Sequence, residues 1–400
     1  MLLVVMLVGM VAVLFVFGIV DTTAIELRRN QDTAAAFANV KQALIGWSVQ
    51  RTSSGALPNA RPGELPCPDM NNDGFEDGNC AAGALGRVPW KTLGIPEPKD
   101  GAGETLWYAI AGPFRIWGVN ANPINSDTKG NLTVYRDSTA STITTEAIAV
   151  VFAPGVSFGA QNRDTTATAL CPTTGTNIAL NLCAANYLET AATVNNSAIN
   201  GPFISAPSSD TFNDRVMAIT TADLMPLVEI RVAREMLALL DLYKSAAGNT
   251  CGCYTWGDND FNNEGDNDVF RGWLPLGEGD PHIWGPPPAD PGPPINLGIA
   301  IPAWLSNNDW WKVIYYAVAP DESQNKSGGT LTLDGVPGTN VILITPGPAP
   351  QGVPRPLNAP GTAAYWAEYL KDAENADHND NTYVRPSSTA YARNRLYTRP

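Results

Sequence analysis

The chain opens with an apolar run over residues 1–20, which carries no charged side chain before Asp21. Residues 21–50 follow with neither proline nor glycine until Gly46, and most of them have good helix propensity. Four large apolar residues recur there at spacings of three or four, which places them on one helix face: Phe37, Val40, Leu44 and Trp47. The pattern predicts one continuous helix over residues 1–50, apolar on all sides in its first half and amphipathic in its second.

The apolar run has the length of a membrane-embedded helix, because twenty helical residues rise roughly 30 Å. It starts with apolar residues and exceeds the apolar core of a secretory signal, so a cleaved signal peptide is the weaker interpretation. A single-span anchor explains the run but not its unbroken continuation into a soluble helix. We therefore favour a helix that lies in a membrane at one time and packs among copies of itself at another.

Beyond the helix, a series of short patterns occurs twice in the same order. Segments 106–112, 147–155 and 207–220 (LWYAIAG, AIAVVFAPG and PSSDTFNDRVMAIT) are echoed by 314–320, 341–347 and 386–398 (IYYAVAP, VILITPG and PSSTAYARNRLYT). Such apolar and aromatic runs between Gly, Pro and Asn are typical of strands.

A second helix is predicted over residues 221–247, ending before Gly248. The chain thus predicts an α+β fold with a long N-terminal helix and two tandem lobes, residues 51–220 and 221–400. Each lobe is expected to combine a helix, an acidic loop and an antiparallel sheet.

Two loops place side-chain oxygens at alternating positions around a glycine, in the orders D-x-N-x-D-G-x-x-D and D-x-N-x-E-G-x-x-D. Calcium binds such oxygen sets, although Cys80 stands where an EF-hand loop has its bidentate glutamate. The alternative is a turn cluster whose Asp and Asn side chains bond to their own backbone. The candidate calcium ligands are Asp69, Asn71, Asp73, Phe75 and Asp77 in the first loop, and Asp260, Asn262, Glu264, Asp266 and Asp268 in the second.

Six cysteines form three local groups, which in an exported protein indicates a disulfide set. We expect Cys67 to pair with Cys80, and Cys171 with Cys183. A bridge between Cys251 and Cys253 would close a very tight ring, which favours their pairing elsewhere or remaining reduced.

Composition argues against several function classes. Lys and Arg number 25 and Asp and Glu 39, a net charge of −14, so nucleic acid is not an expected partner. The only histidines are His282 and His378, and this scarcity weakens enzymatic interpretations, because acid–base and zinc chemistry often use histidine. Many prolines and glycines indicate a loop-rich β protein with polar, weakly charged surfaces, and we expect a protein that is not an enzyme, although carboxylate chemistry is not excluded.

The long helix is followed by the phrase LPCPDMNNDGFEDGNC…GRVPW…GETLWYA, and this combination resembles pilin-like proteins of Gram-negative bacteria. The resemblance covers residues 1 to about 120, and the family includes type IV pilins and the pseudopilins of type II secretion. It implies a subunit with a methylated N-terminus that waits in the inner membrane. On assembly the helix leaves the membrane and self-associates into the core of an extracellular filament, while the calcium- and disulfide-braced lobes form the outer surface.

Two other functions remain as alternatives. Mature pilins and pseudopilins usually carry a glutamate at their fifth position. If Met1 is the mature first residue, Val5 stands there, and this departure favours a minor, tip-located pilin or pseudopilin. The other alternative is a single-span membrane-anchored adhesin whose tryptophans bind surface glycans. For the cluster at Trp304, Trp310 and Trp311 we expect core packing, with a sugar-stacking or partner surface as the alternative.

Overall fold

The computed structural model describes residues 2–399 with gaps at 54–58, 79, 81–84, 117, 119, 160, 164–182, 259–268, 275–298, 324–327, 351, 353, 357, 359–361, 378–379 and 386–393. Within the helices, side chains are described from Ala24 onward, except those of Ser306 and Ala363. The chain forms two compact units. The first contains Met1–Gly46, Pro66–Gly112 and Asn131–Ile219, and the second contains Trp47–Leu65, Pro113–Gly130 and Thr220–Pro400.

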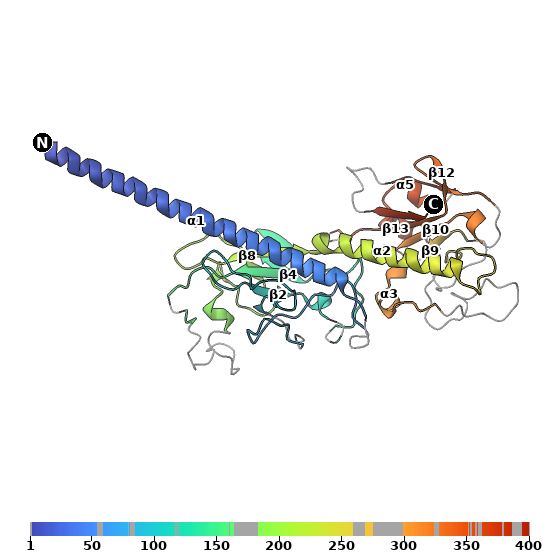
Figure 1. Cartoon of the computed structure of the whole chain (residues 1–400), viewed down its shortest axis with the longest axis horizontal. Helices are drawn as coiled ribbons and strands as arrows, with labels where there is room; N and C mark the ends of the chain where they lie inside the picture. The colour runs from blue at the N-terminus through green and yellow to red at the C-terminus, as the bar shows by residue number, and fades with distance from the viewer. Residues whose placement is uncertain are drawn as a thin grey trace. The chain divides into compact units, whose positions relative to one another are not determined.

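Helix α1 runs without interruption from Leu2 to Gln50, as the residue pattern predicts (Figure 1). Of the predicted apolar stripe, Val40 and Leu44 are buried, while Phe37 and Trp47 are half-buried. The predicted membrane and filament-core segment, residues 1–20, lies outside the described side chains. Among the residues that are described in full, no helix has the length and apolar character needed to cross a membrane.

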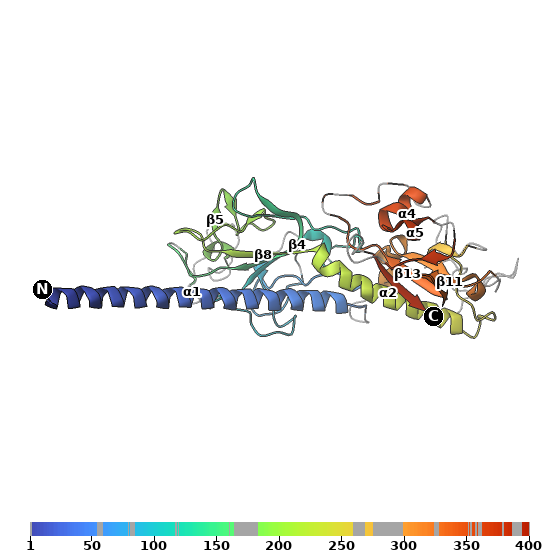
Figure 2. The same cartoon turned by 90° about the horizontal axis from the view of Figure 1, so that it is seen from above.

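The second half of α1 lies beside the main sheet of the first unit (Figures 1 and 2). The backbone of Gly101 comes so close to the helix that a Cβ atom there would lie 2.2 Å from the Arg29 carbonyl oxygen. At the same place the Gly101 N–H donates to Thr33 Oγ1 at 2.9 Å. Only glycine permits this approach, and the contact fixes the helix against the loop.

The sheet of the first unit is built around one long buried strand, β4. Its strand order is β1-β2-β4-β3-β7, and β8 also pairs with β4. The last seven residues of β4 are all buried, which explains the continuous apolar run there in place of an alternating pattern. The strands are β1 (Leu85–Arg87), β2 (Trp107–Ile110), β3 (Leu132–Tyr135), β4 (Thr142–Ala153), β7 (Phe203–Ile204) and β8 (Arg215–Thr220), with a separate pair β5 (Thr190–Ala191) and β6 (Val194–Asn195), and short 3₁₀ turns η1 (Gly112–Phe114) and η3 (Ala184–Asn186).

The second unit begins its longest segment with α2 (Thr221–Ser245), which packs on β13 and β15 (Figure 2). The Thr220 N–H donates to Asp223 Oδ2 at 2.9 Å and thereby caps the helix start. A four-stranded sheet has the order β15-β13-β10-β9, and a three-stranded sheet the order β12-β11-β14. These strands are β9 (Arg271–Trp273), β10 (Tyr315–Val318), β11 (Leu331–Leu333), β12 (Val336–Thr339), β13 (Val341–Thr345), β14 (Thr382–Tyr383) and β15 (Arg395–Arg399).

Short helical pieces cover the second unit, and the described chain as a whole has an α+β fold. They are α3 (Ala303–Asn307), η4 (Trp310–Lys312), η5 (Pro320–Glu322), α4 (Ala363–Tyr369) and α5 (Ala373–Ala376).

The two units share one strand arrangement. In the first, β1, β2 and β4 pair in succession with β8 beside β4, and in the second β9, β10, β13 and β15 follow the same order. The register also agrees, because Gly86 lies opposite Tyr108 and Gly272 lies opposite Tyr316. Each tyrosine hydroxyl then donates to a backbone carbonyl, that of Pro66 at 3.2 Å in the first unit and of Thr255 at 2.8 Å in the second.

A buried guanidinium group joins three segments of the second unit. Arg61 donates to the Asn122 and Asn120 carbonyl oxygens at 2.6 and 2.7 Å, and to Asn308 Oδ1 at 3.0 Å. Its side chain has no exposed surface, and burial lowers the pKa of Arg61 to about 10. Segments 47–65 and 113–130 are thereby fixed to the end of α3.

A second pair of charges supports this guanidinium. Buried Glu64 lies 3.8 Å from Arg61 Nε and accepts a hydrogen bond from Arg51 Nε at 2.7 Å. The two arginines therefore share one carboxylate, and loss of either cation leaves the buried charge of Glu64 less well balanced.

Replacing Arg61 should destabilise the second unit strongly. The change Arg61→Met removes the donor of three hydrogen bonds and leaves Glu64 partly uncompensated, so we expect the free energy of unfolding to fall by about 3–5 kcal/mol. Denaturant unfolding of the full chain, followed by tryptophan fluorescence, measures this loss. The matched control is Arg385→Met, whose exposed ion pair with Asp334 should contribute less than about 1 kcal/mol. Equal losses in the two variants would contradict the role of the buried group.

Candidate functional site

The first acidic loop, residues 69–77, is organised around the carboxylate of Asp69. Asp69 is buried, and its backbone pairs with Arg87 at the end of β1. Its Oδ1 accepts the N–H groups of Asn71, Asn72 and Asp73 at 3.2, 2.6 and 3.2 Å, and its Oδ2 accepts that of Gly74 at 2.7 Å. Burial nevertheless outweighs these bonds and raises the pKa of the Asp69 carboxyl.

The glycine of this loop is required by its conformation. Gly74 has a φ of +87°, and a Cβ there would lie 2.7 Å from the ring of Trp90. Asn72 also has a positive φ, of 65°, a conformation that asparagine tolerates better than most residues.

The remaining predicted ligands of this loop lie close together and also contact its backbone. Asn71 Oδ1 accepts the Asp73 N–H at 2.9 Å, and Asn71 Nδ2 donates to Asp77 Oδ1 at 3.2 Å. Asp73 Oδ1 accepts the N–H of Phe75 at 2.8 Å, and the Phe75 ring is 53% exposed. The arrangement matches the turn cluster, while each carboxylate oxygen retains further lone pairs for a cation.

The described part of the chain contains no group of three or more His, Cys, Asp or Glu side chains placed to hold a metal ion. The second predicted loop, with Asp260, Asn262, Glu264, Asp266 and Asp268, lies outside the described residues. The residues just before this loop are described. Asp258 is buried, and its backbone pairs with that of Trp273 as the backbone of Asp69 pairs with that of Arg87. In the second unit this pairing therefore lies two residues before the predicted loop begins.

The cysteines confirm one predicted bridge and correct one expectation. Cys67 is bonded to Cys80 as predicted, and Cys183 is also in a disulfide, while Cys171 lies outside the described residues. Cys251 and Cys253 are bonded to each other, contrary to the expectation that the tight ring disfavours this pairing. The physical reason is Gly252, whose φ of +59° turns the chain sharply and brings the two Cα atoms to 5.2 Å.

A groove of about 340 Å³ lies within the first unit, beside the exposed part of α1. Glu26, Arg29, Asn30 and Thr33 form its helix side, and Arg215 faces them from β8 and donates to Asn30 Oδ1 at 2.8 Å. The sequence pattern does not predict this groove, because its walls come from four segments distant in the chain.

Helix α1 is uncovered where it borders the groove. Residues 24–32 are all exposed, including the apolar Ile25 at 52% and Leu27 at 59%. Among the described side chains of this helix, Thr33 is the first that is buried. The exposed face therefore combines apolar side chains with the charges of Glu26 and Arg29.

The three clustered tryptophans belong to the interior of the second unit. Trp304, Trp310 and Trp311 are all buried, and Lys312 Nζ lies 5.2 Å from the centre of the Trp311 ring. Their rings therefore contribute to the core and do not offer an open platform on which a sugar could stack.

Comparison of the chain with protein-family models, with characterised proteins and with solved structures found no match. Function is therefore inferred from the residue pattern and from the geometry described above.

The second unit contains a buried glutamate with a raised pKa. Glu229 on α2 is buried, and Ser126 Oγ donates to its Oε1 at 2.5 Å. Burial raises the pKa of Glu229 to about 7, and the favourable effects of Ser126, Arg355 and Arg395 only partly offset it.

Stability should therefore depend on pH through Glu229. The pKa is higher in the folded chain than the ordinary 4.5, so the favourable contribution is present at low pH and is lost as pH rises toward about 7. Over that interval the free energy of unfolding should fall by about 3 kcal/mol. Glu229→Gln should remove this slope, and Glu235→Gln on the same helix should keep it. Denaturant unfolding across this pH range measures both, and an unchanged slope in Glu229→Gln would contradict the assignment.

Proposed function

We propose that this chain is a structural subunit of an extracellular filament of the type IV pilus kind. Its N-terminal helix lies in the inner membrane before assembly and in the filament core afterwards. The observation that carries the proposal is the unbroken helix α1, whose residues 24–32 stay exposed while Val40 and Leu44 fix its second half. A helix with exposed apolar side chains is stabilised when copies of itself cover them.

The disulfides support an exported location. Cys67–Cys80 and Cys251–Cys253 are bonded, and such bonds persist in oxidising compartments. A minor, tip-located subunit is the second candidate. The three clustered tryptophans give the adhesin alternative no support, because they are buried.

The filament proposal predicts an assembly defect without a folding defect. Burying Ile25 or Leu27 between helices should contribute about 1.5–3 kcal/mol each, so Ile25→Glu and Leu27→Glu should reduce the chain sheared from cells by about tenfold or more. Mass spectrometry of the sheared fraction, which should contain a methylated N-terminal peptide, measures assembly.

The matched control is Val336→Glu, because Val336 on β12 is 66% exposed but lies outside α1. It should assemble like the unmodified chain, and all variants should show an unchanged melting temperature. Equal amounts of every variant in the sheared fraction would refute the helix-core model.

We also propose that calcium braces the acidic loop, since Asp69, Asp73 and Asp77 lie within one nine-residue turn together with Asn71. Calcium should raise the melting temperature of the full chain, and chelation should reverse the effect. Asp73→Asn should abolish this response by removing a carboxylate, whereas Asp137→Asn, at an exposed site on another loop, should keep it. If calcium does not change the melting temperature, the loop is only a turn cluster whose side chains bond to its own backbone.

A further inference from the structure

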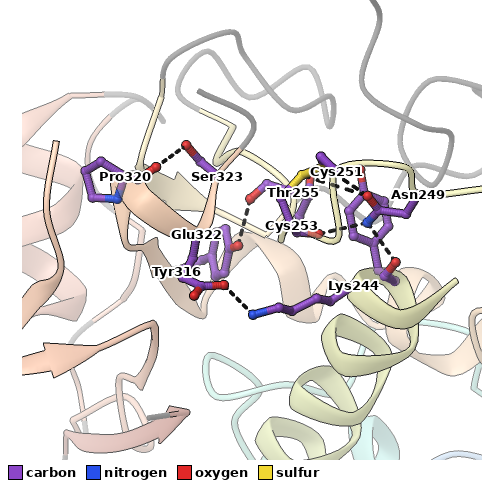
Figure 3. Close-up of a disulfide and its surroundings, with 10 residues drawn as sticks. Lys244, Asn249, Cys251, Cys253, Thr255, Tyr316, Pro320, Glu322 and Ser323 are labelled. Atoms are coloured by element: carbon purple, nitrogen blue, oxygen red, sulfur yellow. Dashed lines mark hydrogen bonds and ion pairs between the residues drawn. A yellow bond between two sulfur atoms is a disulfide. The ribbon is translucent and has the colours of Figure 1, made fainter. Parts of the chain in front are cut away.

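The Cys251–Cys253 disulfide follows the end of α2 in the second unit (Figure 3). Its two sulfurs differ in access, because Cys253 is fully buried while Cys251 is only half-buried. Between them, a Cβ atom on Gly252 would meet nothing within 4 Å, so the outer side of the turn is open. A small reagent can therefore reach the bond at Cys251.

Asn249 faces the disulfide in a fixed orientation (Figure 3). Its Nδ2 donates to the carbonyl oxygens of Tyr243 and Cys253, both at 2.8 Å. The amide cannot be reversed without placing its oxygen against those two oxygens. Its Oδ1 therefore points at the sulfurs, 3.0 Å from Cys251 Sγ and 3.8 Å from Cys253 Sγ.

This orientation distinguishes the two redox states of the cysteine pair. Asn249 is nearly buried, and within the described structure its Oδ1 approaches only these two sulfurs. A disulfide sulfur has no hydrogen to donate, so the acceptor has no donor while the bond exists. A thiol supplies an S–H donor, and the buried acceptor is then satisfied. The surroundings thus favour the dithiol relative to the disulfide.

We propose that Cys251–Cys253 is a thiol–disulfide exchange site for low-molecular-weight thiols, in which Cys251 Sγ is the sulfur attacked and Asn249 stabilises the reduced pair. Asn249 is a positioning residue, because it acts on the cysteines and touches no reagent.

The exchange balances in two steps. A thiolate attacks Cys251 Sγ, the protein S–S bond breaks, and Cys253 Sγ leaves as a thiolate that takes a proton from water. A second thiolate attacks the sulfur of the thiol now bound to Cys251, and Cys251 leaves as a thiolate and is protonated. Two small thiols are thereby oxidised to their disulfide, and the protein disulfide is reduced to a dithiol.

The same molecule contains an internal control. Cys67 and Cys80 are both buried, and their bond closes a longer loop, with a sequence separation of 13 against 2. Cys67–Cys80 is less accessible, and the unsatisfied acceptor Asn249 Oδ1 favours reduction only of the other bond. Both differences predict that Cys67–Cys80 is the harder bond to reduce.

The test is equilibration of the full chain in mixtures of reduced and oxidised glutathione, followed by alkylation and peptide mass spectrometry. Cys251 and Cys253 should become alkylated at a glutathione ratio at least about tenfold less reducing than Cys67 and Cys80 require. Reduction of both disulfides at the same ratio, or of Cys67–Cys80 first, would overturn the proposal.

A variant of Asn249 tests whether this residue stabilises the reduced pair. Asn249→Leu should make Cys251–Cys253 about tenfold harder to reduce, because the acceptor is gone in both states. Asn375→Leu, which removes another buried asparagine of the second unit, should leave the ratio unchanged. An unchanged ratio in Asn249→Leu, or the same shift in both variants, would contradict the role of Asn249.

Variants that keep only one cysteine of the pair test which sulfur is attacked, because they cannot form the Cys251–Cys253 disulfide. Oxidised glutathione should modify Cys251 in Cys253→Ser at least about tenfold faster than it modifies Cys253 in Cys251→Ser, since only Cys251 is accessible. Equal rates would show that Cys251 is not the preferred sulfur.

Discussion

The burial of Arg61 is the constraint on which the second unit depends. A guanidinium removed from water must find acceptors for its donors, and here the acceptors come from segment 113–130 and from Asn308. Since Arg61 itself belongs to segment 47–65, three parts of the chain must be in place together. Residues 220–400 therefore fold around segments contributed by the N-terminal half, and do not form a self-contained lobe.

Local patterns allow the elements of both units to be predicted, because each is determined over a few residues. The spacing of Val40 and Leu44 predicts the buried face of α1, and the echo of LWYAIAG in IYYAVAP matches the shared register of β2 and β10. Contacts between distant segments cannot be predicted in this way. Nothing in residues 51–65 signals that Arg61 meets Asn308, because that contact depends on how the elements pack.

At the candidate sites, too, the residue pattern predicts the local feature but not the contacts of each atom. Alternating Asp and Asn residues predict either a set of cation ligands or a turn cluster, and in residues 69–77 the side-chain oxygens accept hydrogen bonds from the loop's own backbone. The partner of each oxygen depends on backbone dihedrals, since the positive φ of Asn72 and Gly74 turns successive N–H groups toward Asp69. The error at Cys251 and Cys253 has a similar origin. Ring size alone argued against the bond, whereas a left-handed glycine removes most of the steric objection.

The filament proposal depends on a contrast within α1. From Thr33 onward the helix is held by a glycine contact and by buried Val40 and Leu44, so its direction is fixed by the first unit. Over residues 24–32 the same helix is exposed, and it carries both Ile25 and Leu27 and the groove charges Glu26 and Arg29. A helix that served only to tether the chain would not need a fixed direction. Packing among identical helices does need it, because each copy must present the same side chains at the same angle.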